Sequence, residues 1–258
     1  MPHVIAIANE KGGVAKTTTA LSVGGALVEI GYEVLLVDLD AQANLTLGVG
    51  LRPNTLRRTI ADVLLNTRSA LSASRETDLP GLDIIPANSE MNTAERFLPI
   101  RQNYQFILRN ALHNLQLYDY VLLDCPPSLG AVTSNALMAA EWLIIPTQAE
   151  YFSAYALRNM LQLIQRIRQD GNPALAYRIL ITMLDRRNRI HRTIEKQIRA
   201  KFKERVFQTV IQIDTKLRES TVAGLPVTHF SKSSRSAQQY RALTQELIQY
   251  VEEAETIA

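Results

Sequence analysis

Short apolar segments alternate along the whole chain with segments in which apolar residues recur at helical spacing. The apolar segments are rich in Val, Ile and Leu, as is typical of strands buried on both faces. These predicted strands cover residues 3–9, 34–40, 82–87, 118–125, 142–147, 177–184 and 205–211. The predicted helices cover residues 17–31, 89–98, 101–116, 129–140, 153–170, 190–204 and 235–255. The alternation indicates an α/β fold, a single domain with a mostly parallel twisted sheet and helices on both faces.

Polar residues gather after three of the predicted strands. Residues 9–18 follow the first strand, residues 38–44 follow the second, and residues 124–128 follow the strand at 118–125. Open α/β sheets bind their ligands at the carboxyl ends of the strands. The positions of these loops therefore predict a binding site before any motif is considered.

The overall composition fits one soluble α/β domain, and we expect it to span residues 1–258. Hydrophobic residues make up 47% of the sequence, which is enough for a substantial core. The lone cysteine, Cys125, excludes an internal disulfide. The N-terminus has no basic n-region and only a short apolar run before charge appears, so we expect no signal peptide. Because the first strand begins at residue 3, we also expect no separate N-terminal helix-turn-helix domain. No apolar run approaches the ~18 residues of a membrane span, and we expect a cytoplasmic protein.

The loop after the first strand, NEKGGVAKTTT at residues 9–19, has the layout of a phosphate-binding loop. In the pattern G-x-x-x-x-G-K-[ST], Glu10 and Ala15 occupy the two glycine positions. Gly12 and Gly13 let the chain approach an anion closely. The N–H groups at the start of the following helix carry partial positive charge that suits phosphate. The loop predicts a phosphate site, and a glycine-rich turn without a ligand is the alternative.

Three side chains at the end of this loop match the parts of a nucleotide site. Lys16 is placed to reach the β- and γ-phosphates, and Thr17 offers a hydroxyl to Mg²⁺. Thr18 offers a hydroxyl or an amide to the α-phosphate. A second lysine, Lys11, stands ahead of the glycine pair and has no counterpart in the usual pattern.

Carboxylates follow two further strands. Asp124 ends the apolar strand YDYVLLDC, the layout of a Walker B carboxylate that holds Mg²⁺ directly or through water. The alternative for Asp124 is an aspartate that only caps a turn. Asp38 and Asp40, in VDLDAQAN, are two residues apart and share one face of an extended strand. One would serve the metal environment while the other orients or deprotonates water, and the spacing leaves the assignment open.

The segments KGGVAKTTT, VDLDAQAN and VLLDCPPS, in this order and spacing, resemble the ParA/MinD family of deviant Walker A ATPases. They are most similar to the ParA (Soj-like) partition proteins. The likeness extends to LITMLD (180–185), TVI (209–211) and the segment from TKLRES to GLPV (215–227). The family pattern is K-G-G-x-G-K-[TS], so Glu10 is no defect. The resemblance implies a P-loop NTPase fold with ATP and Mg²⁺ as cofactors.

The resemblance also assigns roles to the residues. Lys11 matches the signature lysine that reaches the partner subunit's phosphates in an ATP-bound homodimer and stabilises transition-state charge. Lys16 matches the Walker A lysine, and Asp40 matches the residue that positions the attacking water. The implied catalytic residues are Lys11, Lys16 and Asp40, and the implied metal residues are Thr17, Asp38 and Asp124. The implied nucleotide-binding residues are Lys11, Gly12, Gly13, Val14, Ala15, Lys16, Thr17, Thr18, Met183 and Ile213.

Three departures from the family pattern bear on activity. Ala15 stands where the family has glycine; if this position needs a positive φ, alanine costs about 1 kcal/mol. We expect retained ATP binding with slowed hydrolysis. Ala41 replaces the proline of the family's D-P-Q motif. The I-P-R-N segment that contacts the base in many relatives reads Ile-Gln-Ile-Asp at residues 211–214, which puts adenine contacts there in question.

A basic block lies in the C-terminal third of the chain. Between Arg178 and Arg218 there are twelve Lys and Arg against four Asp and Glu, a local excess of +8 in a chain of net charge +3. Such a block favours a polyanion-binding face, and a solvated helix face is the alternative. ParA-type ATPases bind DNA through basic residues of this portion, mainly by phosphate contacts. The candidate DNA-binding residues are Arg187, Arg189, Arg192, Lys216, Arg218 and Arg235.

The implied function is ATP-dependent partition. An ATP-bound sandwich dimer would bind double-stranded DNA non-specifically, and a ParB-like adaptor would stimulate slow hydrolysis and release the dimer from the nucleoid. The cargo could be a plasmid, a chromosome or another body, without a membrane partner.

One alternative is a MinD-like membrane-cycling ATPase, which the acidic end QELIQYVEEAETIA argues against. Another is a DNA-binding switch with little turnover because of Ala15. A single cysteine argues against an iron–sulfur reductase of the nitrogenase iron-protein type.

Overall fold

One mostly parallel sheet runs through the part of the protein that the computed structural model describes, residues 1–66, 68–150 and 153–257. Within these residues the strands are β1 (His3–Ile7), β2 (Val34–Asp38), β3 (Arg75–Glu76), β4 (Leu82–Ile85), β5 (Tyr120–Asp124), β6 (Trp142–Gln148), β7 (Ala176–Leu184) and β8 (Val206–Gln212). Their order across the sheet is β3-β4-β2-β5-β1-β6-β7-β8. Every neighbouring pair is parallel except β3 and β4, so the expected fold class is confirmed.

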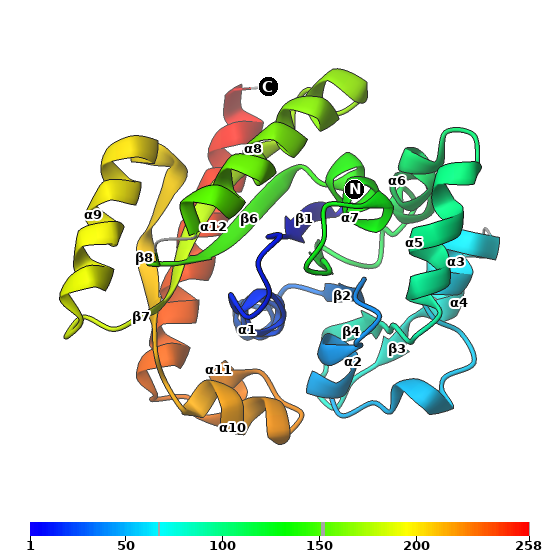
Figure 1. Ribbon diagram of the computed structural model, residues 1–258. Helices are drawn as coiled ribbons and strands as arrows, with labels where there is room; N and C mark the ends of the chain where they lie inside the picture. The colour runs from blue at the N-terminus through cyan, green and yellow to red at the C-terminus, as the bar shows by residue number, and fades with distance from the viewer. Residues whose placement is uncertain (67, 151–152, 258) are drawn as a thin grey trace.

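Helices cover both faces of the sheet (Figure 1). One face packs against α3 (Ile60–Asn66), α4 (Ala70–Ala73), α5 (Met91–Phe97), α6 (Ile107–Leu112), α7 (Ala131–Ala139), α8 (Ser153–Asp170) and α9 (Arg189–Phe202). The other face packs against α1 (Lys16–Ile30), α2 (Asn44–Gly48), α11 (Val227–Phe230) and α12 (Arg235–Ile257). Helix α10 (Lys216–Val222) contacts α2 and α11. Short 3-10 helices cover Pro53–Thr55, Leu98–Ile100, Tyr104–Phe106 and Lys203–Arg205.

The central strands are apolar on both faces because each face has its own layer of helices. In β1, Val4 and Ala6 belong to the core under α3–α9, whereas Ile5 and Ile7 belong to the core under α1 and α12. Successive strand residues point to opposite faces, so one continuous apolar run supplies two cores. This burial explains why the strands were visible in the sequence as uninterrupted runs of Val, Ile and Leu.

Helix α1 packs closely against the C-terminal part of the chain. A Cβ added at Gly25 would lie only 2.4 Å from the Cβ of Pro226, so the contact depends on glycine. The hydroxyl of Thr19 lies 3.2 Å from that of the fully buried Tyr240 on α12. The helix ends as expected at Gly31, which adopts a φ of 105°. These contacts fix the direction in which the first turn of α1 points.

One local prediction was wrong. The helix expected over residues 101–116 is interrupted, because Asn103 adopts a left-handed conformation and only Tyr104–Phe106 and α6 are helical. The last helix begins where we expected it, since α12 starts at Arg235 and buries Ser236 and Ala237. The two-residue β3 and the helices α2, α3, α4, α10 and α11 were not predicted; each is too short to show a clear period. No described helix is both long and apolar enough to cross a membrane.

Candidate nucleotide-binding site

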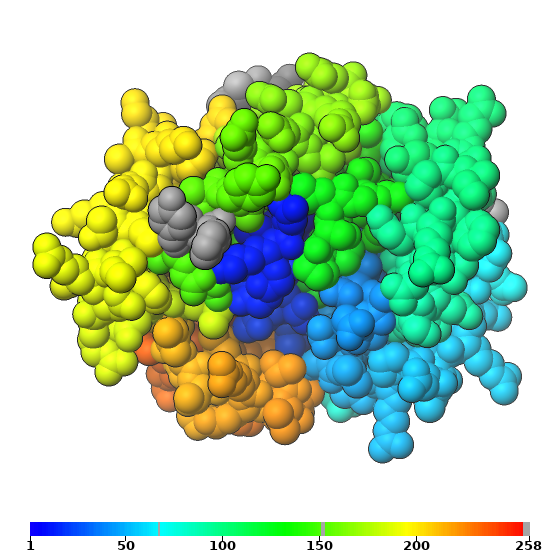
Figure 2. All heavy atoms as spheres, in the orientation of Figure 1, coloured from blue at the N-terminus to red at the C-terminus, as the bar shows by residue number. Residues whose placement is uncertain are grey.

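The strand order brings the three polar loops together at one edge of the sheet. Strand β5 lies between β1 and β2, and its last residue, Asp124, is the register partner of both Ile7 and Asp38. The loop after β1 therefore faces both the Asp38 and the Asp124 ends of the neighbouring strands. Figure 2 shows the N-terminal segment, in blue, at the middle of this face of the molecule, surrounded by segments from later in the chain.

The loop between β1 and α1 is held in shape by side chains from other elements. The Asn9 side chain accepts a hydrogen bond from the backbone N–H of Lys11 (3.0 Å) and donates one to the Pro146 carbonyl (2.7 Å). The Thr182 hydroxyl donates to the carbonyl of Val14 at 3.0 Å. Because these contacts involve backbone atoms of the loop, they leave Gly12 and Gly13 exposed toward a ligand. The Val14 side chain is buried, so this residue has only backbone groups to offer.

Ala15 adopts the left-handed conformation for which glycine is preferred. Its φ and ψ are 68° and 34°, and it caps the N-terminus of α1. Alanine pays a steric cost of about 1 kcal/mol in this region, so the condition that we attached to Ala15 is met. Gly13, two residues earlier, also has a positive φ, of 70°. The loop thus keeps a phosphate-loop backbone although the glycine is missing.

Lys16 is the first residue of α1 and is buried. Burial lowers the pKa of its ammonium group, and the carboxylate of Asp124 opposes that shift. Its Nζ donates to the carbonyl of Lys11 at 3.2 Å. Thr17 and Thr18 follow on the same turn and are partly exposed. A buried cation beside the free N–H groups of a 15-residue helix forms an anion site.

The two buried aspartates differ in how their oxygens are satisfied. Asp38 accepts hydrogen bonds from the backbone N–H (2.8 Å) and the hydroxyl (2.7 Å) of Thr46 and from the N–H of Asp40 (3.1 Å). Neither oxygen of Asp124 has a hydrogen-bond partner among the described residues, although the carboxylate is 1% exposed. The Thr17 hydroxyl is close enough to the Asp124 carboxylate to lower its pKa, although the two groups lie outside hydrogen-bond geometry.

Burial also shifts the pKa values of this pair. Desolvation raises the pKa of Asp38 to about 6, and the hydrogen bonds from Thr46 oppose the shift. Desolvation raises the pKa of Asp124 well above its usual value, and the neighbouring Asp38 raises it further. A buried carboxylate without partners is costly unless a cation joins it. The site therefore fits Mg²⁺: Asp124 and Thr17 would supply oxygen ligands, and Thr46 holds Asp38 in a supporting position.

Asp40 lies at the mouth of the site and is partly exposed. Its carboxylate accepts a hydrogen bond from the backbone N–H of Gln42 at 2.9 Å, which fixes the loop after β2. Because Asp38 is fully occupied by Thr46 and the backbone, Asp40 is the carboxylate of the pair that remains accessible to water. The structure thus distinguishes two aspartates that spacing alone left equivalent.

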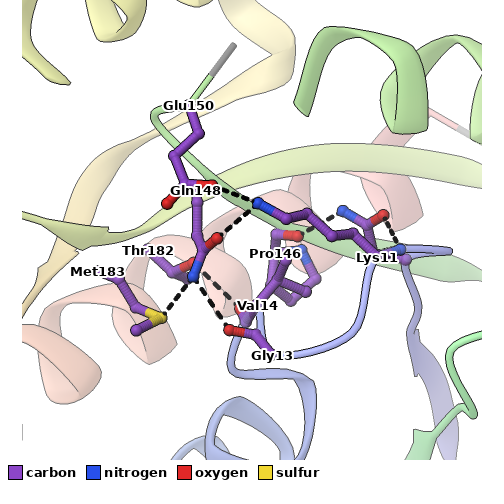
Figure 3. A network of polar contacts seen from close by, with 9 residues as sticks. Lys11, Gly13, Val14, Pro146, Gln148, Glu150, Thr182 and Met183 are labelled. Atoms are coloured by element: carbon purple, nitrogen blue, oxygen red, sulfur yellow. Dashed lines mark hydrogen bonds and ion pairs between the residues drawn. The ribbon is translucent and has the colours of Figure 1, made fainter. Parts of the chain in front are cut away.

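Lys11 is held by residues that we did not predict. Its Nζ donates to Gln148 Oε1 at 2.7 Å and forms an ion pair with Glu150 (Figure 3). The Gln148 side-chain amide also donates to the Gly13 carbonyl at 3.0 Å and contacts the sulfur of Met183 at 2.8 Å. Gln148 ends β6, so the rule that ligands bind at strand carboxyl ends, applied to the strand at 142–147, would have found this cluster.

The two candidate base contacts lie at the same sheet edge, on strands farther from β1. Met183 is near the end of β7 and adopts a left-handed conformation with a φ of 52°, where the pairing with β8 is irregular. Ile213 follows β8, is 52% exposed, and donates its backbone N–H to the Leu184 carbonyl. Met183, which Gln148 connects to the phosphate loop, and the exposed Ile213 are available to an apolar ring.

The candidate DNA-binding residues fall into two groups. Arg189 and Arg192 on α9 and Arg218 on α10 are exposed and have no ion-pair partner among the described residues. The remaining three have local contacts: Arg187 pairs with Asp185, Lys216 pairs with Glu219, and Arg235 donates to the Ile213 carbonyl.

Lys196, Arg199 and Lys203 recur at three- to four-residue spacing, which predicts one basic helix face, but the structure agrees with this prediction only in part. Arg199 donates to the carbonyls of Phe207 and Gln208 and pairs with Glu195, so it joins α9 to β8. Lys203 lies beyond the end of α9 with a φ of 47°. Lys196 remains exposed on α9.

Comparison with known proteins agrees with this geometry. A family model described as an AAA domain matches residues 2–177. The chromosome partitioning protein ParA of Caulobacter vibrioides is 39% identical over 250 residues, which cover 95% of this chain and 94% of that protein. The sporulation initiation inhibitor protein Soj of Bacillus subtilis is 35% identical over 249 residues, covering 96% of this chain and 98% of that protein.

Solved structures with the same fold carry nucleotide. A structure described as cobyrinic acid a,c-diamide synthase from Mycobacterium smegmatis, with a bound ATP analogue and magnesium, is 34% identical with a TM-score of 0.86. The match covers 98% of this chain and 97% of that one. A Cyanothece McdA variant in complex with ATP is 19% identical with a TM-score of 0.86, covers 95% of this chain and 96% of its own, and supports the fold alone. The chain belongs to the ParA/Soj family of P-loop ATPases.

Proposed function

We propose that this protein is an ATP-dependent partition ATPase, a single ATPase domain over residues 1–258. The observation that carries the proposal is the unpartnered, buried carboxylate of Asp124 beside the loop that ends in Lys16 and Thr17. ATP is the substrate, with its phosphates at the start of α1. Asp124 and Thr17 would hold Mg²⁺, and the bound ion would neutralise charge on the phosphate oxygens.

The protein's own residues provide the rest of the reaction. The N–H groups of Gly12, Gly13 and the first turn of α1 bind the phosphate oxygens, and Lys16 neutralises their charge. Asp40 orients the water that attacks the γ-phosphorus atom, and the leaving group is ADP. Lys11 acts on the nucleotide of a second subunit, which makes an ATP-bound homodimer the active species. Met183 and Ile213 border the base.

The exposed cations of α9 and α10 support a DNA-binding face. Arg189, Arg192 and Arg218 are free to contact phosphates, and their contacts would carry no base information. We place the protein in the cytoplasm on nucleoid DNA, where a ParB-like adaptor accelerates hydrolysis and releases the dimer. The partition names of the relatives from Caulobacter vibrioides and Bacillus subtilis support this assignment.

A second candidate is a DNA-binding switch with little turnover. The left-handed conformation of Ala15 favours it, because a methyl group there lies at the start of the phosphate-binding helix. The two functions share ATP binding and dimerisation and differ in hydrolysis. ATPase rate measured with DNA and adaptor distinguishes them, and a rate that stays at the level of an Asp40→Ala variant selects the switch.

The central experiment is light scattering of the protein with ATP, ADP or no nucleotide, together with retention on non-specific DNA. We expect a dimer and DNA retention with ATP only. Lys11→Ala is expected to bind ATP but to remain monomeric, since the variant lacks the group that reaches the second subunit. A normal ATP-dependent dimer in Lys11→Ala would refute the role of Lys11, and absence of nucleotide binding in the parent protein would refute the function.

A further inference from the structure

The ammonium group of Lys11 is bound within its own subunit, at the end of β6. Gln148 accepts one hydrogen bond from it at 2.7 Å, and Glu150 forms an ion pair with it (Figure 3). Lys11 lies far along the chain from Gln148 and Glu150, and the pairing of β1 with β6 brings them together. We propose that Glu150 is a positioning residue that retains Lys11 in its own subunit and thereby opposes ATP-dependent dimerisation. This inference rests on the proposed function.

The proposed function requires the Lys11 ammonium group at a place other than the one it occupies in this structure. One ammonium group cannot pair with Glu150 of its own subunit and at the same time neutralise a phosphate of another. Each subunit must therefore break its Lys11–Glu150 pair before its lysine can cross the interface. A two-fold symmetric dimer breaks two such pairs, so the cost enters twice.

The strength of the pair sets the size of the effect. The Lys11 side chain is 28% exposed and that of Glu150 is 48% exposed, so solvent screens the interaction. A partly exposed pair of this kind is weak, and counting it twice corresponds to about a two- to thirty-fold change in the dimer dissociation constant. ATP overcomes a restraint of this size readily, because its phosphates offer Lys11 several negative charges in place of one.

Gln148 couples the same contact to the nucleotide loop. Its amide oxygen accepts from Lys11 while its amide nitrogen donates to the Gly13 carbonyl and contacts Met183. Changing Gln148 would therefore disturb the loop as well as the lysine. The Glu150 carboxylate contacts the Lys11 ammonium group and forms no hydrogen bond with the loop backbone among the described residues, so the restraint can be removed there alone.

The test measures the dimer dissociation constant by light scattering with ATP for the parent protein and Glu150→Gln. We expect Glu150→Gln to tighten the dimer about two- to thirty-fold, and Glu150→Ala to act in the same direction. The difference in dimer dissociation constant between Glu150→Gln and the parent is expected to become smaller at high salt, because salt screens the Lys11–Glu150 ion pair. Glu76→Gln, which removes the same charge from the exposed edge strand β3, is the matched control and is expected to leave the constant unchanged.

A second measurement tests the contact in the monomer. Amine acylation read by mass spectrometry, without nucleotide, is expected to label Lys11 several-fold faster in Glu150→Gln than in the parent, relative to the exposed Lys196. Equal labelling would show that Glu150 does not retain the lysine. Faster labelling with an unchanged or weaker dimer would overturn the proposed restraint. A parent protein that forms no ATP-dependent dimer would instead refute the proposed function, whatever the labelling shows.

Discussion

Asp38 and Asp124 are register partners on the neighbouring strands β2 and β5, and both carboxylates are buried at the same point of the sheet edge. Thr46 satisfies Asp38, whereas Asp124 has no hydrogen-bond partner among the described residues. Two buried carboxylates at neighbouring positions disfavour each other's charge, so the pair is a source of instability until a cation binds. This relationship links the stability of the protein to its ligand.

The first prediction concerns pH. Burial raises the pKa of Asp38 to about 6 and raises that of Asp124, so the folded state binds protons more tightly than the unfolded state. The contribution of these two carboxyl groups to the free energy of unfolding is fully present below their pKa in the unfolded chain, near 4. It is lost as the pH rises through their higher pKa in the folded state. Without nucleotide and Mg²⁺, Asp124→Asn is expected to be more stable than the parent at pH 8 by about 1–3 kcal/mol, with a smaller gain at pH 5.

Urea unfolding at the two pH values measures this difference. Asp78→Asn removes an exposed carboxylate and serves as the control, for which no gain is expected. The same Asp124→Asn variant is expected to lose about ten- to a hundred-fold in Mg²⁺-dependent ATP affinity. A variant that is less stable than the parent at pH 8 would contradict the proposed state of Asp124.

The second prediction concerns Ala15. Glycine relieves the left-handed strain at φ 68°, so Ala15→Gly is expected to stabilise the protein by up to about 1 kcal/mol and to raise the hydrolysis rate. ATP affinity is expected to improve by less than a hundredfold, since the loop already has its phosphate-binding backbone. Ala43→Gly makes the same change at another left-handed alanine, with φ 53°, and is expected to leave ATP affinity unchanged. A gain of a hundredfold or more in Ala15→Gly would show that the methyl group blocks binding.

The third prediction separates binding from hydrolysis. Asp40 is accessible at the mouth of the site, and Asp38 beside it is fully hydrogen-bonded. Asp40→Asn is expected to reduce the ATPase rate by at least about a hundredfold while ATP affinity changes only a few-fold. Phosphate release and equilibrium nucleotide titration measure the two quantities. Parallel losses in both would mean that Asp40 binds nucleotide and does not position water.

The fourth prediction concerns the basic face. Arg189→Ala, Arg192→Ala and Arg218→Ala are each expected to weaken ATP-dependent DNA retention to a similar extent on any sequence. Each is expected to reduce the slope of affinity against salt by about 1, because one phosphate contact is removed. Arg57→Ala removes an exposed arginine outside α9 and α10 and is the control. If all three variants keep the parent's slope of DNA affinity against salt, DNA does not bind at α9 and α10.

Much of the site was visible in the sequence because its signals are local. A buried strand, a polar loop and a helix start follow one another within a few residues, so Lys16, Thr17 and Asp124 were identified from their own segments. Helical and strand periods are likewise set by burial of neighbouring residues. Segments of fewer than two helical turns, such as α2 and α4, carry no usable period and were missed.

Other features depend on contacts between distant segments. Spacing left Asp38 and Asp40 equivalent, and Thr46 distinguishes them because it satisfies only Asp38. Arg199 looked like part of a basic face, but carbonyls at the start of β8 accept its hydrogen bonds. Partners from distant segments cannot be identified from the neighbouring residues, because an exposed arginine and a hydrogen-bonded one have the same local sequence pattern.

The parallel α/β architecture and the chemistry of the three loops follow from the amino-acid sequence alone, because both depend on the burial and charge of consecutive residues. The tertiary structure sets the strand order, the left-handed backbone at Ala15 and the hydrogen-bond and ion-pair partners of the charged side chains. The clearest example is the pairing of Lys11 with Glu150, which lies 139 positions away in the sequence. That contact exists because β1 and β6 lie side by side, and the order of strands is set by packing across the whole sheet.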